Sequence, residues 1–193
     1  MKSRHLHCRA TSFIMLLSAI FAAILAAPAL AANEESVKQS FADEQLAMRV
    51  MTRTTEQLAA FYTGRGFNKA AIDAITQTCF VGGFVKNKTY DILWMTLDDW
   101  VFTDAQDKRI QRIRRNDWQP IWEKTQLAQS YQSTFSWTLL PDERDLRPDE
   151  HSAGNIPIPW QDEPFKLVAN FKTGADKNGT PRTLTFENLT CRK

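Results

Sequence analysis

Hydrophobic residues recur at near-helical spacing across residues 40–63, namely at Leu46, Val50, Leu58 and Phe61. The residues between them are mostly strong helix formers, so the pattern predicts one helix over this whole segment. Gly64 and Gly66 follow directly and are typical of the end of a helix. Asn68 is a suitable N-cap for a second helix over residues 69–78. The pattern therefore predicts a helical pair near the N-terminus.

After Cys79 the residues favour strands, first at 79–85 and then at 90–97. The spacing of Ile75, Cys79 and Gly83 also fits a continuing helix, so the pattern leaves open whether Gly82–Gly83 lie on a strand or a helix.

The second half of the chain alternates with the period of a half-buried strand. Residues 133–141 and 164–172 each place hydrophobic side chains at every second position. Residues 174–182 predict a hairpin turn centred on Asn178–Gly179. The final segment, 183–191, changes phase, and a bulge near Glu187–Asn188 would place Leu184, Phe186, Leu189 and Cys191 on one face.

Two further segments complete the predicted architecture. Residues 117–129 predict one amphipathic helix with Pro120 in its first turn. Residues 141–164 contain five of the eight prolines and predict a long surface loop with a short edge strand at 155–158. The expected fold class is α+β, with the N-terminal helical pair packed on a small antiparallel β-sheet or sandwich. Residues 32–78 are expected to be mainly helical, and residues 79–193 mainly β with the one helix near 117–129.

The start of the chain has the pattern of a secretory signal peptide. Basic residues precede an apolar run from Phe13 to Ala27, and Ala29-Leu30-Ala31 offers small residues for cleavage. The run is shorter than a membrane-spanning helix and ends at Pro28. We therefore expect residues 1–31 to be removed, leaving residues 32–193 as a single globular domain in the periplasm or outside the cell, with no stable membrane anchor.

Removal of residues 1–31 would change the net charge of the chain, and with it the kinds of partner that charge attraction could favour. The full chain carries 24 basic and 22 acidic residues, and three of the basic ones lie before residue 32. The remaining chain has a formal net charge of −1, which gives no general electrostatic basis for binding nucleic acid. It retains one histidine, His151, and two cysteines.

In an exported protein the two remaining cysteines, Cys79 and Cys191, are expected to form a disulfide. A nucleophilic cysteine would need His151 as its base, and a redox pair would show a Cys-x-x-Cys spacing, which is absent. Zinc would need three or four ligands that this chain hardly supplies. The sequence predicts no cofactor and no metal site.

Two charged segments are candidates for binding. Five cations and a tryptophan stand close together in the first, which could hold an anionic partner or form a solvated helix face with Trp118 in the core. The second places Glu150 and His151 in a proline-rich loop, which could bind a partner or a cation together with Asp149, or simply pair its own charges. The candidate binding residues are Arg109, Arg112, Arg114, Arg115, Trp118, Glu150 and His151.

These features favour a non-catalytic binding or accessory protein of the cell envelope, with another envelope or secreted protein as its partner. The alternative is a small hydrolase that acts on envelope polymers through carboxylates such as Asp99 and Glu150. The chain lacks the Gly-x-Ser-x-Gly and His-Glu-x-x-His motifs of common hydrolases.

Overall fold

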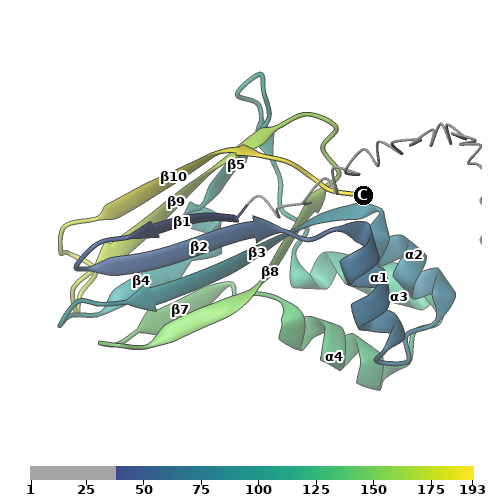
Figure 1. Cartoon of the computed structure of the whole chain (residues 1–193). Helices are drawn as coiled ribbons and strands as arrows, with labels where there is room; N and C mark the ends of the chain where they lie inside the picture. Colours follow the sequence, from purple (N-terminus) through teal and green to yellow (C-terminus); the bar gives the residue numbers. More distant parts are fainter. Residues whose placement is uncertain (1–37) are drawn as a thin grey trace, which may run out of the picture. The chain divides into compact units, whose positions relative to one another are not determined.

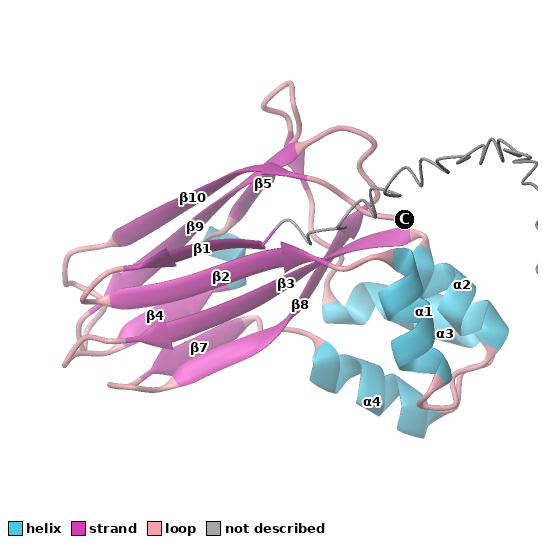
Figure 2. Ribbon diagram, in the orientation of Figure 1, coloured by secondary structure: helices cyan, strands magenta, loops and turns pink. Residues whose placement is uncertain are grey.

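A computed structural model describes residues 38–193 (Figure 1). The predicted signal peptide, residues 1–31, lies outside the described residues. No helix in the described part of the chain is long and apolar enough to cross a membrane. The described residues form two antiparallel β-sheets, with a group of helices at one end (Figure 2). The α+β class with antiparallel sheets is therefore confirmed.

The first sheet has four strands in the order β1-β2-β3-β8. On β2 every second side chain is buried, which gives the alternation of a strand with one face in the core. The strands are β1 (Lys38–Ala42), β2 (Leu46–Thr52), β3 (Thr78–Asn87) and β8 (His151–Pro159). The predicted edge strand at 155–158 is the second half of β8, which pairs with β3 along its whole length and lies at the edge of the sheet.

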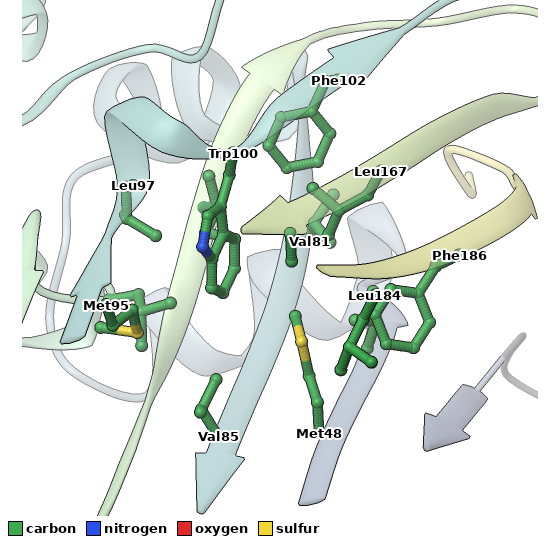
Figure 3. Packing of buried hydrophobic residues seen from close by; sticks show 14 of the residues in the cluster. Met48, Val81, Val85, Met95, Leu97, Trp100, Phe102, Leu167, Leu184 and Phe186 are labelled. Carbon is green, nitrogen blue, oxygen red and sulfur yellow. The ribbon is translucent and has the colours of Figure 1, made fainter. Parts of the chain in front are cut away.

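The second sheet has the order β6-β5-β9-β4-β7, and β10 pairs with β9. Its strands are β4 (Leu93–Thr96), β5 (Val101–Thr103), β6 (Arg109–Ile110), β7 (Glu143–Leu146), β9 (Phe165–Thr173) and β10 (Arg182–Leu189). A short 3₁₀ turn, η1 (Leu97–Asp99), connects β4 to β5. The inner faces of the two sheets share one hydrophobic core, in which Met48 and Val81 of the first sheet lie near Leu167 and Leu184 of the second (Figure 3).

The helices form a second hydrophobic core at the end of the sandwich (Figure 1). They are α1 (Thr55–Thr63), α2 (Lys69–Thr76), α3 (Gln119–Thr125) and α4 (Gln129–Thr138), and the 3₁₀ turn η2 (Arg115–Trp118) leads into α3. Phe80 of β3 belongs to this helical core and contacts Trp118 and Phe135. The helical core is thereby attached to the first sheet through the start of β3.

The prediction of one helix over residues 40–63 was wrong in its first half. Strands β1 and β2 occupy residues 38–52, so the helical pair α1–α2 lies between β2 and β3 and not at the N-terminus. Leu46 and Val50 are four residues apart, an even spacing that fits one face of a strand as well as a helix, and Met48 between them is also buried. The helix begins only after Thr54, whose hydroxyl accepts a hydrogen bond from the Gln57 backbone N–H in a capping box.

The prediction of a strand at residues 133–141 was also wrong, because most of this segment forms helix α4. Residues 79–193 therefore contain two α-helices, α3 and α4, in place of the single helix expected near 117–129. Phe135 is buried and Trp137 is exposed, since residues two apart on a helix point to nearly opposite sides. The apparent alternation joined residues from two different faces.

Three other local features can be compared with the sequence pattern, and the bulge in the last strand is confirmed. Gly82 and Gly83 lie on strand β3, which settles the ambiguity left by the sequence. The ladder between β9 and β10 shifts register between Phe186 and Leu189, and Asn188 there has a left-handed backbone with φ of 55°. The hairpin turn lies earlier than expected, because the Lys177 N–H donates to the Gly174 carbonyl and both residues have positive φ.

The predicted disulfide between Cys79 and Cys191 is present, with a Cα–Cα distance of 5.4 Å. Cys79 lies on β3 of the first sheet, and Cys191 follows β10 of the second. The bond therefore joins the two sheets. It lies close to the start of α1, where the Thr55 N–H donates to the Arg192 carbonyl.

Tyr62 gives a prediction for alkaline stability. Its ring is buried between α1 and α4, its hydroxyl lies 2.9 Å from Thr138 Oγ1, and burial raises the pKa of its hydroxyl to about 12. The unfolded chain loses this proton near pH 10, so the stabilisation is complete below pH 10. It is lost between about pH 10 and pH 12, and the loss amounts to about 3 kcal/mol. Denaturant unfolding across this range should show the loss in the wild type and in Tyr90→Phe, whose tyrosine is fully exposed, but not in Tyr62→Phe. Equal alkaline loss in Tyr62→Phe would contradict this assignment.

Candidate functional site

The basic segment predicted from the sequence, residues 108–115, runs from β6 into η2 and is not a helix face. Ile110 at its start is buried in the core between the sheets. At its centre the Ile113 N–H donates to the carbonyl of Pro157 on the edge strand β8. The segment is therefore held against both the sandwich and the helical group. Its arginines differ in how far their side chains are exposed to solvent.

Arg112 is the fixed member of the segment. Its guanidinium contacts Asp142 Oδ1 at 2.6 Å and Asp98 Oδ1 at 2.7 Å, and only 11% of its side chain is exposed. Hydrogen bonding to Arg112 lowers the pKa of Asp98, and Arg114 and Arg109 contribute further to the shift. Because Asp98 lies on η1 and Asp142 directly precedes β7, Arg112 ties three segments together. Arg112 is thus a structural residue rather than one offered to a partner.

Arg109 and Arg114 are the accessible members. Arg114 shares Asp98 with Arg112, at 3.1 Å, while 59% of its own side chain is exposed. Arg109 is exposed on β6 and makes no ion pair among the described residues. Together with Arg112 they line a hollow of about 100 Å³, which we call the arginine hollow. The hollow is lined by three arginines and one carboxylate, Asp98, and Asp142 also pairs with Arg112, so surplus positive charge remains there.

Trp118 does not belong to any binding surface, which corrects its assignment as a candidate binding residue. It is completely buried in the helical core, stacked on Trp122 with ring centroids 5.1 Å apart and packed on Phe135 at 4.6 Å. The alternative interpretation of this tryptophan, as part of the core, is the one that the structure supports.

Glu150 and His151 lie at the opposite end of β8 from the basic segment. His151 begins β8, and about 20 Å of strand separates it from Pro157, which contacts the basic segment. His151 stacks on Phe84, with centroids 5.5 Å apart, and a carboxylate oxygen of Glu150 accepts from the Arg147 N–H of its own turn at 3.0 Å. The sequence-predicted residues therefore fall in two separate places.

The carboxylates named for hydrolysis are not brought together as a pair. Asp99 forms an ion pair with Lys172 at 3.3 Å, and Glu150 is engaged in its turn. A general acid needs a raised pKa, whereas the neighbouring Asp98 has a lowered one. No group of three or more metal-ligating side chains occurs among residues 38–193. Asp149, which precedes Glu150 and His151, forms an ion pair with Lys86 at 3.2 Å.

Sequence reasoning missed the most exposed tryptophan of the described chain. Trp137 on α4 is 88% exposed, and it borders a groove of about 440 Å³ between α4 and the η2–α3 segment, which we call the α3–α4 groove. Arg115, a predicted candidate, also lines this groove and donates from Nη1 to the Ser136 carbonyl. A helical interpretation of residues 129–138 would have placed Trp137 opposite Phe135 and revealed it.

A larger and more apolar groove of about 670 Å³ lies between α2 and α3 and ends at Trp160. Ala70, Ala74 and Ile121 contribute to its lining. Nothing in the described structure indicates what would cover it.

No family model and no curated protein matches the chain. Among solved structures, the yjhA protein from Bacillus subtilis is 9% identical, with 68% of this chain and 76% of that chain covered and a TM-score of 0.39. The ycdA protein from Bacillus subtilis subsp. subtilis strain 168, a proposed lipoprotein, is 12% identical over 80% of this chain, with a TM-score of 0.38. The chain spans 39% of the length of the ycdA protein. Both likenesses are distant, and neither bears on function.

Proposed function

We propose that the protein is exported and acts as a non-catalytic binding or accessory protein of the cell envelope, and that it docks an acidic patch of another envelope or secreted protein at the arginine hollow. The observation that supports this proposal most is that the arginines differ in exposure and in ion pairing. Arg112 is fixed by Asp98 and Asp142, while Arg109 and Arg114 are left exposed around the same hollow. A fixed loop that presents exposed guanidinium groups in excess of its carboxylates is suited to bidentate contacts with carboxylates of a partner.

Export is supported by the disulfide between Cys79 and Cys191, because disulfides persist mainly in oxidising compartments. The signal-peptide pattern of residues 1–31 agrees with this location. A binding role is favoured over hydrolysis because the exposed carboxylates near the hollow neutralise arginines, and none of them is placed beside a second free carboxylate.

The test is charge reversal at the accessible arginines. Arg109→Glu/Arg114→Glu should reduce capture of the protein's partner from the exported fraction of its own host by about tenfold or more, because like charges then meet across the interface. Arg112 is left unchanged so that the loop keeps its anchor. The matched control is Lys38→Glu/Arg147→Glu, an equal change in charge at exposed cations on other strands and turns.

Capture that is quantified by mass spectrometry should be retained by the control variant and should weaken as salt is raised. Identical capture by the wild type and by Arg109→Glu/Arg114→Glu would overturn the proposed docking site. Turnover of a cell-wall glycan or ester that is lost in Asp99→Asn would instead favour the hydrolase.

A further inference from the structure

The α3–α4 groove has an unusual set of lining residues. One wall is a single face of α4, where the polar residues follow helical spacing, and the other is formed by η2 and α3. Its lining consists of Arg115, Asn116, Gln119, Trp122, Gln129, Gln132, Ser133, Ser136 and Trp137. Amides and hydroxyls therefore make up most of the groove, together with two tryptophans and one cation.

This composition argues against several classes of ligand. No aliphatic side chain lines the groove, so an apolar peptide side chain or acyl chain would find little apolar surface beyond the indole rings. One arginine is too little positive charge for a polyphosphate chain, which needs several cations. No carboxylate, histidine or cysteine is among its lining residues, so the described groove lacks the groups that hold cations or perform acid–base chemistry.

The same composition suits a sugar. Each amide presents both donors and an acceptor, and each serine presents a hydroxyl, which matches the paired donors and acceptors of neighbouring sugar hydroxyls. The side chains of Asn116, Gln129 and Ser133 make no hydrogen bond to another part of the described chain, so their polar atoms are available. Trp137 presents a broad ring next to them, on which the C–H face of a pyranose can pack.

Arg115 adds a preference for an acidic sugar. Its Nη1 holds the Ser136 carbonyl and so links the two walls, which leaves the other guanidinium donors free to meet a carboxylate. Arg114, the preceding residue, lines the arginine hollow instead, so two neighbouring arginines serve separate surfaces.

We propose that the α3–α4 groove binds an acidic glycan, with Trp137 as the stacking platform, Arg115 as the carboxylate ligand and the amides of both walls as hydroxyl ligands. The open groove has no catalytic groups on either wall, so the glycan is held rather than cleaved. This site is distinct from the arginine hollow, and the proposal goes beyond protein docking. An envelope accessory protein could thus hold a glycan and a protein at the same time.

The experiment measures binding by tryptophan fluorescence and calorimetry on the oxidised protein. The probes are a galacturonate oligosaccharide, a cell-wall fragment containing N-acetylmuramic acid, a neutral galactose oligosaccharide of matched length and poly-L-glutamate. The wild type should bind at least one acidic sugar more tightly than the neutral one. Trp137→Ala should weaken this binding by about tenfold or more, equivalent to about 1.4 kcal/mol, and Trp137→Phe should restore most of it. Arg115→Gln should reduce the preference for the acidic sugar over the neutral one.

Three results would overturn the proposal. The first is the absence of binding to both acidic sugars, and the second is binding that Trp137→Ala leaves unchanged. The third is equal binding of poly-L-glutamate that Arg109→Glu/Arg114→Glu abolishes, since that would show charge attraction at the arginine hollow only. The two sites use different residues, so the two proposals can fail separately. If Arg109→Glu/Arg114→Glu loses protein capture but keeps glycan binding, the arginine hollow and the α3–α4 groove act independently.

Discussion

Replacing Cys79 and Cys191 together by alanine is expected to lower the free energy of unfolding by about 4 to 5 kcal/mol. The disulfide closes a loop with a sequence separation of 112 residues. Cross-linking so long a loop removes a large part of the conformational entropy of the unfolded chain, and that loss is the source of the estimate. The effect approaches the whole stability of many single domains, so the variant should be partly unfolded at growth temperature.

The measurement is urea unfolding of the oxidised wild type, of the reduced wild type and of Cys79→Ala/Cys191→Ala. The last two should agree within about 1 kcal/mol, because the alanine variant also loses a little packing at the buried Cys79. Hydrogen exchange should report where the folded variant loosens first. We expect the first amides to lose protection in the segment around Arg192 and Thr55, which are linked by a backbone hydrogen bond beside the disulfide. Equal stability of the oxidised and reduced wild type would contradict the entropic argument.

The disulfide was predictable because the signal-peptide pattern predicts an oxidising compartment and leaves two cysteines, which allow one intramolecular pairing. The strands β9 and β10 were predictable for a similar reason, since strict alternation at Phe165, Leu167 and Ala169 has no competing helical period. The bulge at Asn188 followed from the change of phase that would otherwise have turned Leu189 away from the core.

The misassigned segments are those in which an even spacing fits both periods. Leu46 and Val50 satisfy a helix and a strand equally, and pairing of β2 with β1 and β3 decided between them. Phe135, Trp137 and Leu139 alternate as in a strand, but α4 forms because Phe135 packs against Trp118 and Trp122 of the helical core. Such long-range contacts leave no trace in a local window of sequence.

The candidate site was predictable in part. The density of arginines between Arg109 and Arg115 identified the basic segment, but the sequence could not separate Arg112 from its neighbours. That distinction depends on Asp98 and Asp142, which come from two other segments. Glu150 and His151 belong to the second charged segment, which the sequence predicts as a separate candidate. The length of β8 keeps the two groups apart.

Trp118→Ala is expected to lower the free energy of unfolding by about 3 to 5 kcal/mol, the range for truncating a buried aromatic side chain. Trp118 is completely buried and contacts Phe80, Trp122 and Phe135, so its removal leaves a cavity bounded by rings that are themselves fixed by other contacts. Trp137→Ala should change the free energy by less than about 0.5 kcal/mol, because an exposed side chain loses little contact. Denaturant unfolding of both variants provides the comparison.

A third variant separates packing from polarity at the same position. The indole N–H of Trp118 is buried without a hydrogen-bond partner among the described residues, so Trp118→Phe removes an unsatisfied donor while it keeps most of the ring. We expect it to recover most of the stability that Trp118→Ala loses. If Trp118→Ala had the same free energy of unfolding as the wild type while Trp137→Ala lost several kcal/mol, the assignment of one tryptophan to the core and the other to the surface would be reversed. The α3–α4 groove would then lose its platform, because Trp137 can stack on a ligand only if the fold does not need it.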